Sequence, residues 1–126
     1  MMDECAKQRK LLASEFWQYR KVFVALGDET RQQIFIELLE NDKIGMRVPE
    51  ITQRTHLSRP AVSHHLQILK DSGLISMYRV GTMNFYYVDA DGGSWRGLKM
   101  LVDHVDQVVA CAAENGYPRL NEDVAP

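Results

Sequence analysis

Over the N-terminal third of the chain, apolar residues recur at spacings of three and four, a pattern that predicts amphipathic helices. From about residue 6 to residue 26 these apolar positions are Leu12, Phe16, Tyr19, Phe23 and Leu26. Gly27 ends this helix, and the Asp28 carboxylate is suited to cap a second helix that runs to about Glu40. The second helix is predicted to turn four apolar side chains inward: Ile34, Phe35, Leu38 and Leu39.

Two shorter helices, separated by a tight turn, are predicted next. Pro49 suits the first turn of a helix that ends near His56, because the N–H that proline lacks is not needed there. Ser58 is a good N-cap for a helix over residues 59–72, and Gly73 stops it. A short helix, a tight turn and a second helix make a helix-turn-helix, here over about residues 48–73.

The hydrophobic period then changes from that of a helix to that of strands. Residues 74–80 and 85–88 are rich in β-branched and aromatic side chains, and residues 81–84 between them form a turn, so we expect a β-hairpin, or wing, over about residues 74–89. Residues 91–93 break it, and a last helix follows over residues 95–114. The fold class is therefore mainly α with a β-hairpin wing (α+β), a winged helix-turn-helix of element order α-α-α-α-β-β-α.

Length and composition fit one globular domain over residues 1–126, with 45% hydrophobic and 25% charged residues. The polar segment 117–126 is expected to be a mobile tail. No apolar run is long enough for a membrane span, and the N-terminus lacks the features of a signal peptide. Two cysteines do not make a disulfide framework, so we expect a cytoplasmic protein with no membrane partner.

The net charge of −2 hides an uneven distribution along the chain. Residues 43–82 carry six basic side chains against two acidic ones, while both flanking segments are acidic. A basic middle is what a protein needs if one face meets phosphate and the rest does not.

The helix predicted over residues 59–72 has two distinct faces. Val62, Leu66 and Leu69 form an apolar stripe that must pack inward. The opposite face carries side chains able to bond base edges or phosphates in the major groove: Arg59, Ser63, His64, Gln67 and Lys70. A polar helix face is more often simply solvated, but the short preceding helix, the wing and the local basic surplus favour double-stranded DNA as the partner.

Enzymatic function is not indicated. Ser63, His64 and Asp71 have the side chains of a catalytic triad but lie on one helix, with no strained nucleophile turn. Gly92 and Gly93 precede a helix without the lysine or the glycine spacing of a phosphate-binding loop. We expect no catalytic residues and no cofactor.

Three segments resemble the ArsR/SmtB family of repressors: residues 25–31 (ALGDETR), 57–66 (LSRPAVSHHL) and 69–75 (LKDSGLI). The resemblance covers about residues 8–114. It implies a homodimeric repressor that an inducer, often a metal ion, releases from DNA. In that dimer, the helices over about residues 6–26 and 94–115 are expected to serve dimerisation. It also implies that Ser58, Arg59, Ser63, His64 and Gln67 read DNA, and that Arg79 and Thr82 in the wing touch the DNA backbone or the minor groove.

The metal sites of that family are not matched. One places two cysteines in the helix that begins here near Val48, and residues 48–54 contain none. The other would start at Asp103, and its remaining positions fall on Val105, Gly116 and Arg119. His104 and Asp106 are too few ligands for a site, and His64 and His65 point about 100° apart on their helix. We therefore expect no metal, and an inducer of another kind.

The last helix carries more apolar surface than one chain can cover, so a second copy of the chain is the expected partner. The predicted dimer interface consists of Leu12, Phe16, Tyr19, Leu101, Val105, Val108 and Ala112. A two-fold dimer implies a palindromic operator with half-sites about 34 Å apart.

Cys5 and Cys111 allow two interpretations. In the first, which we favour, Cys111 fills a small apolar site in the last helix and Cys5 lies in a frayed terminus. The reason is that free cysteine often acts as a small apolar residue. Alternatively, the pair senses oxidants or reactive sulfur, as in some metal-free relatives of the family. A separate alternative concerns the partner: the winged helix could serve only protein–protein contacts instead of binding DNA.

Overall fold

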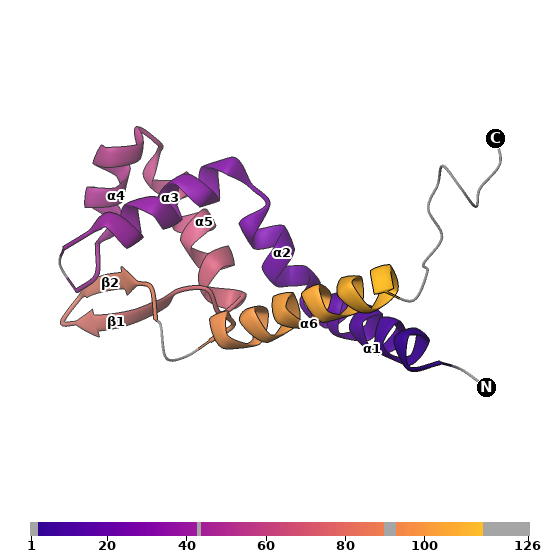
Figure 1. Cartoon of the computed structure of the whole chain (residues 1–126). Helices are drawn as coiled ribbons and strands as arrows, with labels where there is room; N and C mark the ends of the chain where they lie inside the picture. The colour runs from indigo at the N-terminus through magenta and orange to yellow at the C-terminus, as the bar shows by residue number, and fades with distance from the viewer. Residues whose placement is uncertain (1–2, 43, 90–92, 115–126) are drawn as a thin grey trace, which may run out of the picture. The chain divides into compact units, whose positions relative to one another are not determined.

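Within residues 3–42, 44–89 and 93–114, which the computed structural model describes, six helices and one hairpin follow one another (Figure 1). Residues 19–97 form one compact unit, here called the helix-turn-helix unit, and the residues before and after it form a second, the terminal unit. The elements are α1 (Glu4–Gln18), α2 (Arg20–Leu26), α3 (Glu29–Glu40), α4 (Val48–Thr55), α5 (Arg59–Asp71), β1 (Ser76–Val80), β2 (Met83–Tyr87) and α6 (Trp95–Glu114).

The first predicted helix is two helices, so the element order has one more helix than expected. Tyr19 leaves the helical conformation, with φ −94° and ψ 10°, and separates α1 from α2. Its phenol occupies the space beside Gly97, where a Cβ atom would collide with the ring. The apolar spacing runs across this break unchanged, which is why the sequence pattern indicated one continuous helix.

Side-chain caps begin α3 and α5 where the sequence places them. The Asp28 carboxylate accepts a hydrogen bond from the Arg31 N–H (2.9 Å), and the Ser58 hydroxyl oxygen accepts one from Ala61 N–H (3.2 Å). Each cap satisfies one of the N–H groups that a helix start leaves without a partner. On α3, Ile34 and Leu38 are buried as predicted, but Leu39 is 58% exposed, so its predicted inward position is wrong.

The wing is an antiparallel hairpin with a tighter turn than predicted. Val80 pairs with Met83, so only Gly81 and Thr82 form the turn, and β2 begins two residues before the expected strand. Gly81 has φ +62°, the conformation that the first position of a two-residue type II′ hairpin turn requires. Met83 and Asn84 have weak β-propensity, so the sequence pattern assigned them to the turn. The geometry of the two-residue turn sets the pairing register of the two strands instead.

A short third strand segment joins the wing to the start of α4. Met46 exchanges two backbone hydrogen bonds with Tyr86, both 2.8 Å long. Figure 1 shows the hairpin beside α3. The core of this unit consists of side chains with less than 2% exposure: Ile34, Met46, Ile51, Val62, Leu66, Leu69 and Leu74.

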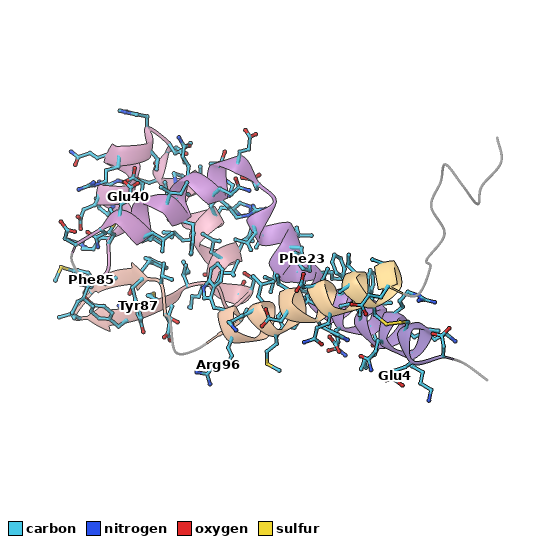
Figure 2. The ribbon with its side chains drawn as sticks, viewed as in Figure 1. Glu4, Phe23, Glu40, Phe85, Tyr87 and Arg96 are labelled. Atoms are coloured by element: carbon cyan, nitrogen blue, oxygen red, sulfur yellow. A yellow bond between two sulfur atoms is a disulfide. The ribbon has the colours of Figure 1, made fainter. Side chains whose placement is uncertain are left out.

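In the terminal unit, a disulfide joins Cys5 of α1 to Cys111 of α6, with Cα atoms 6.0 Å apart (Figure 2). Cys5 is only 8% exposed. The favoured interpretation, a frayed Cys5 and an unlinked Cys111, is therefore wrong. The spacing along the chain gave no indication of the pairing, because it depends on α1 lying beside α6. The predicted tail, residues 117–126, lies outside the described residues.

Candidate nucleic-acid interface

The helix α5 separates its two faces as completely as the sequence predicts. Val62, Leu66 and Leu69 have no solvent exposure, so they fix the rotation of α5 about its axis. Every side chain predicted to contact DNA is exposed: Ser58, Arg59, Ser63, His64, Gln67 and Lys70 at α5, and Arg79 and Thr82 in the wing. A helix with one face packed and one polar face open has the geometry needed to enter a major groove.

The Ser58 hydroxyl oxygen accepts the capping hydrogen bond, and its O–H can still donate to a ligand. A hydroxyl has one donor and two acceptor positions, and the bond from Ala61 uses only one acceptor position. The start of α5 also carries the positive end of the helix dipole. This end of α5 is therefore suited to a phosphate oxygen.

On the exposed face of α5, the Gln67 amide is held by an intrahelical bond. Its Nε2 donates to the Asp71 Oδ1 at 2.7 Å, one turn further along. The Oε1 atom and the second N–H of the amide remain available, and these are the two atoms that pair with an adenine edge. Asp71 therefore positions a side chain that is predicted to read DNA.

A buried arginine of α3 links α2 to α5. Arg31 is 9% exposed and donates to the carbonyl oxygens of Ala25 (2.8 Å) and Val24 (3.1 Å), and its Nη1 lies 3.3 Å from Nδ1 of His65. Burial lowers the pKa of His65, and the Arg31 charge lowers it further while Asp28 opposes the shift. His65 is thus packed and hydrogen-bonded, and Arg31, its partner, was not identified from the sequence.

The pKa of Asp28 is lowered as well, chiefly by the bond from the Arg31 backbone N–H. The charged carboxylate is therefore the form that caps α3. The start of α3 is therefore connected to the middle of α5 through Asp28, Arg31 and His65. These contacts set the position of α5, the helix that carries the polar face.

The wing is stiffened by aromatic packing and by Arg79 itself. Tyr78 and Phe85 stack with ring centroids 5.1 Å apart, and the Tyr78 hydroxyl donates to the Ile44 carbonyl. The Arg79 Nε donates to the Gly81 carbonyl at 2.9 Å, which holds the arginine along the turn. Figure 2 labels Phe85 and Tyr87 on this hairpin.

A pocket of about 250 Å³ opens where α4, α5 and the wing meet. It is lined by Arg47, Val48, Pro49, Arg59 and Asn84. Arg59 was predicted as a DNA contact, whereas Arg47 and Asn84 were not, because only the folded chain brings the three elements together.

The predicted dimer residues differ in how far they are exposed. Leu101 and Val108 are buried within the protomer, at 3% and 7% exposure, whereas Phe16 is half exposed. Leu12, Tyr19, Val105 and Ala112 have intermediate exposure. The large apolar side chains that α1 and α6 leave open are Leu11, Phe16, Trp17, Met100, Val102 and Val109, most of which were not in the predicted set.

His104 is fully engaged in the terminal unit rather than available to an ion. Its Nδ1 lies 2.8 Å from Glu15 Oε2 and its Nε2 lies 2.8 Å from Gln8 Oε1. Within the described part of the chain there is no group of three or more His, Cys, Asp or Glu residues that could hold a metal. In the same part of the chain, no helix is long and apolar enough to cross a membrane.

The fold, with the open polar face of α5, is that of a winged helix-turn-helix transcriptional regulator. The profile of the family described as bacterial regulatory protein, arsR family, matches residues 28–77. The chain is 41% identical over 88 residues to an uncharacterized HTH-type transcriptional regulator of Methanocaldococcus jannaschii, an alignment that covers 70% of this chain and 91% of that protein. The protein belongs to the ArsR family of transcriptional regulators.

Two further likenesses agree with this assignment. The transcriptional repressor SdpR of Bacillus subtilis is 38% identical over 65 residues, which is 52% of this chain and 69% of that protein. The homodimeric winged helix-turn-helix DNA-binding domain of a possible ArsR-family regulator from Mycobacterium bovis superposes with a TM-score of 0.55 at 26% identity. That superposition covers 89% of this chain and 92% of the other.

Proposed function

We propose that the protein is a repressor that binds a palindromic operator as a homodimer, with α5 in the major groove. The observation that carries this proposal is the open polar face of α5, opposite three side chains without any solvent exposure. The SdpR repressor is similar in sequence over 52% of this chain.

In this proposal the residues divide by chemistry. Arg59 and Gln67 bond guanine and adenine edges, and Ser63 and His64 contact bases or nearby phosphates. Ser58 and Lys70 contact the DNA backbone. Arg79 and Thr82 follow the strand beside the groove, where an arginine held along a tight turn is suited to phosphate or to the minor groove.

A second copy of the chain is the proposed cover for the open apolar side chains of α1 and α6, such as Trp17 and Met100 at 65% and 67% exposure. The similar Mycobacterium bovis domain is homodimeric. Replacing Val102 or Val109 with Glu is expected to give monomers in analytical ultracentrifugation and weaker operator binding. A dimer unchanged by both substitutions would place its interface elsewhere.

The experiment that tests operator binding starts from the reduced protein and a random pool of duplexes. Selection is expected to yield a palindrome with half-sites about 34 Å apart. Binding of the selected duplex should resist competitor DNA, and Arg59→Ala should weaken it, whereas Lys99→Ala, whose ammonium pairs with Asp103 at 3.2 Å, should not. Absence of any DNA binding at low salt would favour the protein–protein alternative. The same assay with small molecules and metal ions added would identify an inducer that does not use the family's metal sites.

A second candidate function, sensing of oxidants or reactive sulfur, is favoured by the disulfide between Cys5 and Cys111. Two thiols and one molecule of hydrogen peroxide give the disulfide and two molecules of water. Because the bond ties α1 to α6, the two states of the cysteines are expected to differ in the packing of these helices and in operator affinity.

The redox candidate is tested by measuring operator affinity with dithiothreitol and after peroxide treatment. The wild-type affinities should differ, and those of Cys111→Ser should not. Equal wild-type affinities in the two states would exclude the switch and leave the disulfide as a structural link.

A further inference from the structure

The pocket between the start of α4, the start of α5 and strand β2 has the chemistry of an anion site. Two arginines, Arg47 and Arg59, line it together with Val48, Pro49 and Asn84, and no acidic side chain does. Among the described residues neither guanidinium is paired with a carboxylate. Arg47 and Arg59 bring two positive charges to one small pocket, and a bound anion would offset their mutual repulsion.

The backbone around the pocket reinforces its positive potential. Arg47 directly precedes α4, and Arg59 is the first residue of α5, so the positive ends of two helix dipoles meet there. The N–H groups of Glu50 and Ile51 already donate to the Arg47 carbonyl, and Pro49 has none. These three positions leave no helix N–H for a ligand, and the side chains of Arg47 and Arg59 are the strong donors beside the pocket.

Asn84 gives an independent indication that the pocket is incomplete. Its Oδ1 is buried and has no hydrogen-bond partner among the described residues. Buried polar atoms are normally bonded, and an arginine has five N–H donors, enough to bond Asn84 and a ligand oxygen together. If a bound anion drew a guanidinium into the pocket, one N–H of that guanidinium could donate to Asn84 Oδ1.

We propose that this pocket holds one backbone phosphate of the DNA, gripped by Arg47 and Arg59 and oriented by Asn84. The inference rests on the proposed operator binding by α5 and adds Arg47 and Asn84 to its contacts. A volume of 250 Å³ equals roughly eight waters, enough for a phosphate group. A DNA strand is the source because Arg59 lies at the start of the groove-facing helix, and the first helix of a helix-turn-helix crosses the backbone.

The phosphate site is tested by the salt dependence of binding to the selected operator and to an unrelated duplex. Each neutralised phosphate contributes about −0.9 to the slope of log K against log salt. Arg47→Gln should reduce the magnitude of that slope by about one and weaken both duplexes about equally, by about fivefold at ~0.15 M salt. Arg54→Gln is the matched control, because that arginine lies on the same helix with its guanidinium 3.7 Å from Glu37. Its slope should stay near that of the wild type.

Neutral methylphosphonate linkages, introduced one at a time, identify the phosphate itself. A methylphosphonate at one position in each half-site should weaken binding by the wild type. The same substitution should not weaken binding by Arg47→Gln any further. Asn84→Asp, which puts a carboxylate in the pocket, should weaken both duplexes more than Arg47→Gln does, with the fold checked by circular dichroism.

The outcomes separate the two proposals. If the wild type binds its operator but Arg47→Gln keeps the full slope and the same methylphosphonate sensitivity, the phosphate site is wrong and operator binding stands. If Arg54→Gln lowers the slope equally, the effect is one of general charge and the site is also wrong. If only inorganic phosphate protects the wild type against thermal unfolding and no duplex binds, the pocket is a free-anion site and both proposals fail.

Discussion

Nη1 of Arg31 lies 3.3 Å from Nδ1 of His65, across the interface between α3 and α5. An arginine only donates hydrogen bonds, so Nδ1 of His65 must be the acceptor and the proton of the neutral ring lies on Nε2. A second proton on Nδ1 would face a fixed positive charge. The contact therefore requires a neutral histidine in the middle of the helix that carries the polar face.

The stability of the protein should consequently fall when the pH is lowered through the range in which His65 becomes charged. Burial lowers the pKa of His65 below its usual value near 6.5, so the unfolded state binds the proton more readily than the folded state. The contribution is fully present above about pH 6.5 and is lost as the pH falls through the folded pKa. The measurement is the urea midpoint at about pH 7.5 and about pH 5.5.

His65→Gln is the matched variant, because its amide oxygen still accepts from Arg31 but does not titrate. Its urea midpoint should fall less than that of the wild type over the same pH interval. Asp28 and His64 are the other charged groups near His65, and both remain in the variant. Equal pH dependence in the two proteins would show that His65 does not control this transition.

Gln67 is expected to determine the preference at one base pair of each half-site. Gln67→Ala should reduce discrimination there by about 1–3 kcal/mol and leave the other positions unchanged. Asp71→Ala removes the bond that holds the amide at 2.7 Å, so it should reduce the same discrimination by less. Competition among single-base operator variants measures both effects, and an unchanged profile for Gln67→Ala would remove it from the base-reading set.

The disulfide should contribute to stability as well as to any switching. It closes a loop between residues 106 positions apart, and such a link stabilises a folded chain by about 2–4 kcal/mol. Dithiothreitol should lower the melting temperature of the wild type and leave that of Cys111→Ser unchanged. A wild-type melting temperature that does not respond to reductant would contradict this contribution.

Gly93 is expected to tolerate a side chain far less well than Gly81, although both have a positive φ. A Cβ atom at Gly81 would meet nothing, so Gly81→Ala should cost about 1–2 kcal/mol of backbone strain alone. A Cβ atom at Gly93 would collide with the Gly73 carbonyl, which already accepts a bond from Ser94 N–H at 2.8 Å. Gly93→Ala should therefore be the less stable of the two in urea unfolding, and equal stabilities would contradict the close approach.

The sequence by itself determined the helix-turn-helix, its caps and the two faces of α5. These features depend on residues within about one or two helical turns: the Ser58 cap, the Gly73 stop, and the spacing of Val62, Leu66 and Leu69. Local hydrogen bonds and helical periodicity follow from such short-range order. The resemblance of residues 57–66 to a known family pointed to the same helix.

Only the tertiary structure decided the contacts between elements distant in sequence. Met46 pairs with the wing, Arg31 reaches His65, and Cys5 meets Cys111, in each case across tens of residues or more. The break at Tyr19 belongs here too, because it accompanies packing beside Gly97 rather than any change in apolar spacing. Periodicity specifies which face of a helix is buried, but not which partner covers it, since many packings bury the same apolar area.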